Sequence, residues 1–161
     1  LLDGALIITF LTAVFDSFVI NFSWIVLSLA ILSGIVKLTY WKVMDRPSPS
    51  TSATATGLGD GSESVTLLDS PTTSENFVMR EMGFRVARKH TQRLRKLTII
   101  LLFLIPTAAA VITLFEQNGS ILLISSLLAL VSAGIGTVIE RWLFFAEAKH
   151  VVTLFYGAKS L

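Results

Sequence analysis

The chain has 161 residues, of which 53% are hydrophobic and only 15% are charged, and its mean hydropathy is +0.73. Soluble domains carry about 25% charged residues, so this composition indicates a membrane protein. The absence of cysteine excludes a disulfide, a thiolate-held iron–sulfur cluster and a nucleophilic thiol in this sequence. The net charge of +2 comes from cations that cluster beside apolar runs, which favours a role in membrane orientation over nucleic-acid binding.

Residues 1–44 predict one clipped and one full transmembrane helix. The stretch from 5 to 41 is almost wholly apolar and is broken by Asp16 and Asn21. As a single helix it would be about 55 Å long, whereas a hydrocarbon core is about 30 Å thick. We therefore expect a partial crossing up to residue 15, a turn near Asp16, and a full crossing that ends at Trp41. One long amphipathic helix over both segments is the alternative. Because the apolar run begins at Leu1 with no charged segment or cleavage pattern before it, we predict no signal peptide and expect a piece of a larger protein.

Residues 45–71 are rich in Ser, Thr, Pro and Gly and contain little that a core could bury. This composition predicts a flexible loop. Its GLGDG sequence at 57–61 resembles a phosphate-binding loop only superficially, because no predicted strand precedes it and no GK[ST] follows it. We therefore do not expect nucleotide binding.

Residues 72–96 predict a basic amphipathic helix. Thr72 and Glu75 have the spacing of a capping box, and apolar residues recur among the cations that follow. An apolar run at 97–115 comes directly afterwards, so the positive-inside rule predicts that 42–96 and the C-terminus are cytoplasmic. We assign membrane orientation or partner docking to seven cations: Arg80, Arg85, Arg88, Lys89, Arg93, Arg95 and Lys96.

Residues 97–161 predict a transmembrane helical hairpin followed by an interfacial tail. Pro106 is expected to kink the first of its two crossings. A polar turn at 116–120 separates that crossing from the last one, at 121–145. The fold class is therefore all-α: a polytopic bundle of about three full crossings and one clipped crossing, with a long cytoplasmic loop and a basic amphipathic helix.

Four residues are candidates for binding quinol or relaying protons: Glu140, Glu147, His150 and His90. Ionisable groups near a membrane boundary must find a partner or a polar cavity. Glu147 and His150 are three residues apart, so a helix would make them neighbours, and a carboxylate beside an imidazole can exchange protons near neutral pH. An interfacial helix end with surface ion pairs is the alternative for these residues. The sequence contains no catalytic triad and no metalloprotease motif, so no autonomous active site is predicted.

Three segments resemble the C-terminal part of the dimethyl sulfoxide reductase membrane anchor subunit, the DmsC family. They are ATATGLG at 53–59, EMGFRVARKHxxxLR at 81–95 and ERWLFFAEAKHVVTLFYG at 140–157. Members of this family are anchors with about eight crossings, so the resemblance implies a C-terminal half. It also implies a multi-pass protein of the bacterial inner (cytoplasmic) membrane that oxidises menaquinol, binds no cofactor of its own, and assembles with an iron–sulfur subunit and a molybdopterin catalytic subunit. The family's groups tied most closely to quinol lie in earlier helices.

Two other functions stay open at this point. A small-solute transporter would have broken helices with charges facing each other at mid-membrane. A purely structural helix bundle would use the basic helix for assembly alone.

Overall fold

The computed structural model describes residues 1–15, 19–46, 51–59, 65–66, 68–69, 85–115, 118–148 and 154–155. The elements in these ranges are helices. Three stretches are long and apolar enough to cross a membrane: Phe22–Met44, Thr91–Phe115 and Gly119–Glu147. The prediction of an all-α polytopic bundle is therefore confirmed.

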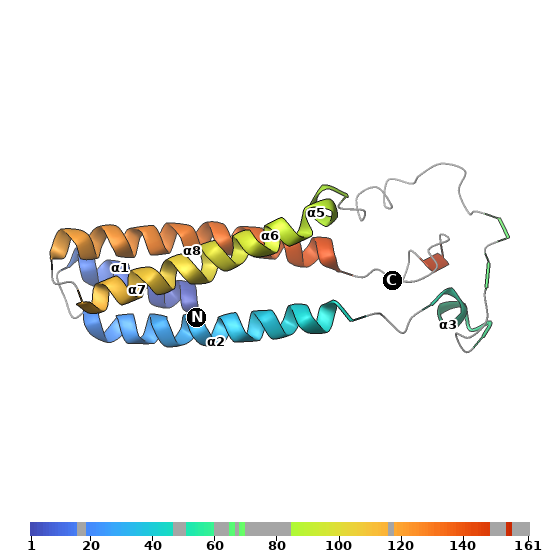
Figure 1. Ribbon diagram of the computed structural model, residues 1–161, viewed down its shortest axis with the longest axis horizontal. Helices are drawn as coiled ribbons and strands as arrows, with labels where there is room; N and C mark the ends of the chain where they lie inside the picture. The colour runs from blue at the N-terminus through green and yellow to red at the C-terminus, as the bar shows by residue number, and fades with distance from the viewer. Residues whose placement is uncertain are drawn as a thin grey trace.

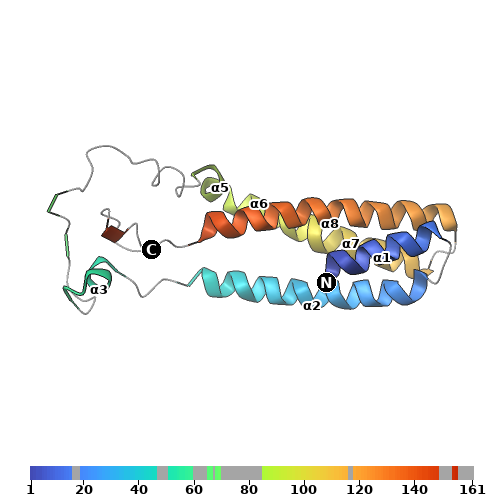
Figure 2. The ribbon, with the colours of Figure 1, turned by 180° about the vertical axis from the view of Figure 1, so that it is seen from behind.

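The first two helices lie side by side. α1 (Leu2–Val14) packs against both α2 (Val19–Met44) and α8 (Gly119–Glu147). A single straight helix over both segments is thereby excluded. With 13 residues, α1 spans only part of the bundle, and the N-terminus lies near mid-length of α2 (Figures 1 and 2).

The third crossing is a continuous helical path of three elements: α6 (Thr91–Thr98), the π-helix η1 (Ile99–Leu104) and α7 (Ile105–Phe115). In the π-helix, the backbone N–H of Ile105 donates to the carbonyl of Ile100, five residues earlier. Pro106 follows directly and has no N–H to donate, so the irregular turn lies beside the residue predicted to distort this crossing. The helix begins at Thr91, six residues before the predicted start.

α8 begins after Asn118, whose side chain accepts a hydrogen bond (3.0 Å) from the backbone N–H of Ser120. Its buried face consists largely of small residues: Ser125, Ser126, Ala129, Ser132, Ala133 and Gly136. Such residues let helix backbones approach closely. A Cβ atom built on Gly136 would lie 2.9 Å from the backbone nitrogen of Leu102, so α8 meets the π-helix at this glycine.

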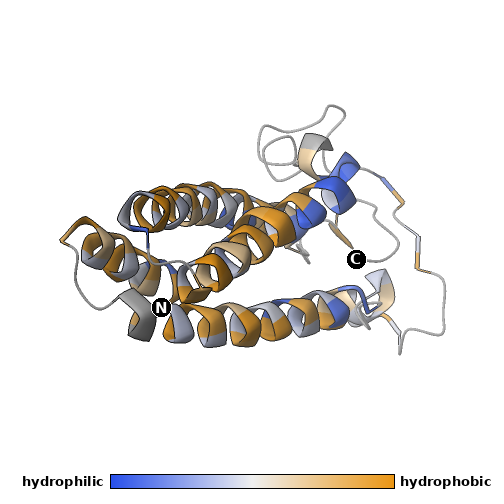
Figure 3. Ribbon diagram, turned by 60° about the vertical axis from the view of Figure 1, so that its left-hand side comes forward, coloured by the Kyte–Doolittle hydropathy of each residue, from blue (hydrophilic) through white to orange (hydrophobic). Residues whose placement is uncertain are grey.

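The helices are arranged as a ring in which α1 and α7 both lie between α2 and α8. We call the end where α2 and α8 finish and α6 begins the charged end. Hydrophilic residues gather there on α5 (Arg85–Lys89) and α6, whereas apolar residues follow the helices along their length (Figure 3). Because α1 starts near mid-length, it covers α2 and α8 only in the half of the bundle away from the charged end (Figures 1 and 2).

Two predicted segments differ from the observed structure. Within the predicted loop 45–71, α3 (Ser52–Thr56) forms because Thr51 and Thr54 cap it reciprocally, and it ends at Gly57 with φ = 70°. Gly57 therefore ends a helix. A phosphate-binding loop would instead come directly before the start of a helix. The described part of the predicted basic helix 72–96 consists of two helices, α5 and α6, which His90 separates. The predicted capping box at Thr72 lies outside the described residues.

Candidate functional site

Arg95 joins three helices at the charged end. Its guanidinium donates two hydrogen bonds of 2.8 Å to the two carboxylate oxygens of Asp45, directly after α2. Its Nε donates a third, of 2.7 Å, to Glu147 at the end of α8. The guanidinium carbon also lies 5.3 Å from the ring centre of Trp41. The fork geometry of arginine suits this combination of carboxylates and an aromatic face.

A second ion pair lies deeper in the bundle, between Lys37 on α2 and Glu140 on α8. Their side chains are only 15% and 12% exposed. The ammonium of Lys37 also lies 4.5 Å from the ring centre of Tyr40. Arg141 is a more distant partner of Glu140, at 3.4 Å, and its side chain is largely exposed. In this half α1 is absent, so the Lys37–Glu140 pair joins α2 to α8 directly.

A third polar contact lies one further turn into the bundle. The hydroxyl of Thr137 on α8 is 3.2 Å from one carboxylate oxygen of Asp3 and 3.4 Å from the other. Asp3 lies in the first turn of α1 and is half-buried. Thr137 and Glu140 are three residues apart, so they share one face of α8. That face therefore meets Asp3 and Lys37 on successive turns.

Three buried polar atoms lack a hydrogen-bond partner among the described residues: Trp41 Nε1, Thr98 Oγ1 and Glu147 Oε2. Two of these residues contact Arg95, and the third follows it on α6. Trp41 and Glu147 contact Arg95, and Thr98 lies one turn further along the same helix. They provide an N–H donor, a hydroxyl and a carboxylate acceptor.

The structure places the four predicted quinol or proton candidates differently. Glu140 and Glu147 are both partly buried and form ion pairs, each with a different helix. His150 lies outside the described residues, so its predicted contact with Glu147 stays a prediction. His90 is half-buried at the start of α6, and its side chain makes no capping hydrogen bond.

The predicted basic residues divide into two groups. Arg88 donates to the carbonyls of Ala146 (3.1 Å) and Ala148 (3.3 Å), which end α8, and Arg95 is held by its two carboxylates. Lys89, Arg93 and Lys96 are exposed and form no ion pair within the part of the chain that the structure describes. Arg80 lies outside the described residues, as does the side chain of Arg85. The exposed group is free to meet lipid headgroups or a partner.

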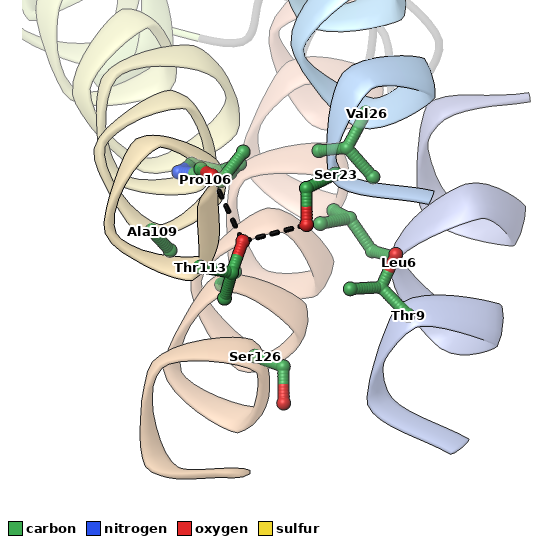
Figure 4. Close-up of a pocket in the computed structure, with 10 residues that line it drawn as sticks. Leu6, Thr9, Ser23, Val26, Pro106, Ala109, Thr113 and Ser126 are labelled. Atoms are coloured by element: carbon green, nitrogen blue, oxygen red, sulfur yellow. Dashed lines mark hydrogen bonds between the residues drawn. The ribbon is translucent and has the colours of Figure 1, made fainter. Parts of the chain in front are cut away.

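The opposite half of the bundle contains a small pocket that is partly open to the outside. Hydroxyl groups from α1, α2, α7 and α8 line it, together with apolar side chains (Figure 4). Ser23 and Thr113 share a hydrogen bond of 2.7 Å, and Thr113 also donates to the carbonyl of Ala110. Thr9 and Ser126 donate to carbonyls of their own helices. Because these hydroxyls are all satisfied, the pocket is a site of helix packing.

No group of three histidine, aspartate or glutamate side chains in the described ranges is placed to hold a metal ion. The charged side chains of the site form the ion pairs and hydrogen bonds described above.

Sequence reasoning missed the deeper residues Asp3, Lys37 and Thr137. A signal was present, because Asp3, Asp16 and Lys37 are the three charged residues in the first 41. An isolated charge within a membrane-spanning run marks a functional position by default. Glu140, the partner of Lys37, is 103 residues away in the sequence, so only the folded structure shows that the two residues pair.

Comparison with known proteins identifies no relative: no family model, curated protein or solved structure matches this chain. The functional argument therefore depends on its residues and their arrangement.

Proposed function

We propose that this chain is part of the membrane anchor and menaquinol-oxidising subunit of a dimethyl sulfoxide reductase-type respiratory molybdoenzyme. The observation that carries the proposal is the carboxylate of Glu147 at the charged end. Glu147 is held by Arg95 through one oxygen, and its other oxygen is buried without a partner in the described residues. A fixed, buried carboxylate with a free acceptor oxygen suits proton abstraction from a quinol hydroxyl.

The chemistry divides between this chain and its partners. Oxidation of one quinol to a quinone breaks two O–H bonds and releases two protons and two electrons. The sequence contains no cysteine to hold an iron–sulfur cluster. The proposal therefore assigns the electrons to an iron–sulfur partner subunit and the reduction of the terminal S- or N-oxide to a molybdopterin subunit. The carboxylates of this chain accept the protons.

The proposed location is the bacterial cytoplasmic membrane, with the charged end in the cytoplasm. The exposed cations Lys89, Arg93 and Lys96 adjoin the third crossing, and Lys42 lies at the end of α2. Cations beside membrane spans are retained in the cytoplasm. The same cations provide a surface for anionic headgroups or for a partner subunit.

A small-solute transporter is a second candidate, and two observations favour it. The Lys37–Glu140 pair lies inside two spans, and the π-helix interrupts the third crossing. Charges within the membrane and irregular helices are features of transport proteins. Purification of the intact protein distinguishes the two functions.

The test is affinity purification of the full-length protein from membranes of anaerobically grown cells. We expect a molybdenum protein and an iron–sulfur protein to co-purify, and the complex to reduce an S- or N-oxide with a menaquinol analogue as donor. Recovery of a protein without metals or partners, together with solute uptake by reconstituted vesicles, would support transport and contradict the anchor proposal.

A further inference from the structure

We propose that the exposed face of α6 and of the apolar helix that continues it binds an anionic phospholipid of the leaflet at the charged end. Arg93 and Lys96 on α6 bind the phosphate group, and the apolar residues that follow them contact the acyl chains. The proposal rests on the membrane location of the bundle and is independent of quinol chemistry. It names lipid, and not a partner subunit, as the molecule that these cations bind.

The first argument is the way in which α6 divides its cations between two faces. The side chain of Arg95 is only 11% exposed and binds Asp45 and Glu147. Arg93 and Lys96 are exposed and form no ion pair within the described ranges. They are three residues apart, so they are neighbours on one face of the helix. Arg95 holds the carboxylates described beside it, and the exposed pair is left with a positive charge that an anion from outside the chain can neutralise.

The second argument is depth. Arg95 binds Glu147, the last residue of α8, so the third crossing and α8 end at one level. The apolar run 97–115 is about 28 Å long as a helix, close to the roughly 30 Å of a hydrocarbon core. Lys96 therefore lies at the edge of the hydrocarbon, and Arg93 lies about 5 Å further out. The headgroup layer extends about 5–8 Å beyond the hydrocarbon on each side. Both cations thus lie at the depth of the lipid phosphates.

The aromatic residues of α8 support this depth. Trp142 and Phe145 lie within the last two turns before Glu147, and their side chains are 43% and 59% exposed. Exposed tryptophan is typical of the boundary between hydrocarbon and headgroups. The two cations therefore lie just beyond an aromatic boundary, on a neighbouring helix that packs against α8.

The third argument is the order of residues along the exposed face. Leu97, Ile100 and Leu104 follow Arg93 at helical spacings of four, three and four residues. Their side chains are 40%, 44% and 57% exposed. Figure 3 shows the same order on the ribbon, with hydrophilic α6 followed by an apolar helix.

A phospholipid has this order as well, because its anionic head is followed by apolar chains. A soluble protein or polyanion could contact only the cationic part of the face, since the apolar part lies in the bilayer. The observed face therefore matches a lipid over its whole length.

The test measures the lipid preference of the full-length protein in phosphatidylcholine vesicles that contain a trace of spin-labelled lipid. Electron paramagnetic resonance separates labels immobilised at the protein surface from those in the bulk bilayer. We expect stronger immobilisation of spin-labelled phosphatidylglycerol than of spin-labelled phosphatidylcholine. The preference should shrink in 1 M salt, where the Debye length falls to about 3 Å. Equal immobilisation of the two lipids at low salt would overturn the proposal.

Two double variants assign the preference to this face. Arg93→Gln with Lys96→Gln removes both charges, and it should lower the preference by at least about fivefold, the effect of one basic residue at an anionic surface. Both side chains are exposed, so the fold should be unaffected. The matched control, Arg93→Lys with Lys96→Arg, keeps both charges and should keep the preference. A preference that survives removal of the charges, or that disappears in the control, would contradict the assignment.

The outcomes separate this inference from the proposed function. A complex that oxidises quinol, but whose anchor shows no preference for anionic lipid, contradicts only the lipid site. A protein with the preference but without metals, partners or quinol activity contradicts only the proposed function. If the charge-removing variant loses a partner subunit while its lipid preference is unchanged, the cations bind protein and the lipid proposal is overturned.

Discussion

The two halves of this bundle are held together by different forces. In the half away from the charged end, four helices meet through small residues and satisfied hydroxyls, as at Ser23 and Thr113. In the charged half, α1 is absent, and α2 and α8 are joined by Lys37–Glu140 and through Arg95. Close packing of small residues requires only that the helix surfaces have complementary shapes. An ion pair removed from water adds little net stability, but the loss of one of its two partners is costly. We therefore propose that the charged half carries the function.

The largest effect is expected from breaking the deep ion pair. Lys37→Met leaves the largely buried carboxylate of Glu140 with only its more distant partner Arg141, which should cost about 3 kcal/mol of unfolding free energy, the lower end for a broken buried pair. The double variant Lys37→Met with Glu140→Leu removes both charges and should recover most of that loss. Unfolding in mixed detergent micelles measures both. A single variant as stable as the wild type, or a double variant no better than the single, would contradict this account of the charged half.

A smaller effect is expected where α8 meets the π-helix. Gly136→Ala places a Cβ atom 2.9 Å from the backbone nitrogen of Leu102. Because backbone cannot move as a side chain does, we expect a loss of about 1–3 kcal/mol from overpacking. The matched control is Gly134→Ala, two residues away, where an added Cβ meets nothing within 4 Å. Thermal unfolding of the two variants in the same detergent should separate them, and equal midpoints would refute the close contact.

The smallest effect is expected in the other half. Ser23→Ala removes the hydrogen bond to Thr113, and interhelical hydrogen bonds in membranes contribute about 0.6 kcal/mol on average. Ser28→Ala is the matched control, because Ser28 is exposed and donates only to the carbonyl of Trp24 on its own helix. Chemical unfolding should therefore place Ser23→Ala slightly below the control. A loss above that of Lys37→Met would reverse the proposed contrast between the halves.

The fold followed from the sequence where composition and length decide it. The apolar runs predicted three full crossings and a clipped one, and the structure has three spans with α1 beside them. Boundaries were less accurate. The third crossing starts at Thr91 because the cationic helix α6 continues without a break into the apolar run. Hydropathy alone does not reveal this continuation. The helix α3 depends on a local cap at Thr51. The segment is rich in residues typical of loops, so its composition did not predict this helix.

The candidate site followed from the sequence only in part. Glu140 and Glu147 stood out because they are carboxylates beside apolar runs, and in the structure both are partly buried and form ion pairs. Their partners Lys37 and Arg95 come from other helices, and contacts between distant segments require the packed structure. Asp3 belongs to the site because α1 begins beside Thr137, which no local pattern indicates.

The most direct test of the contrast between the halves compares one variant from each in the assembled complex. Glu147→Gln removes the buried acceptor at the charged end, and Ser23→Ala removes a packing contact at the other. If proton transfer takes place in the charged half, Glu147→Gln should lower quinol-driven turnover by about 10²-fold, the lower end for loss of a general base, while the amount of assembled complex is unchanged. Ser23→Ala should keep its turnover. Full turnover by an assembled Glu147→Gln complex would contradict the account.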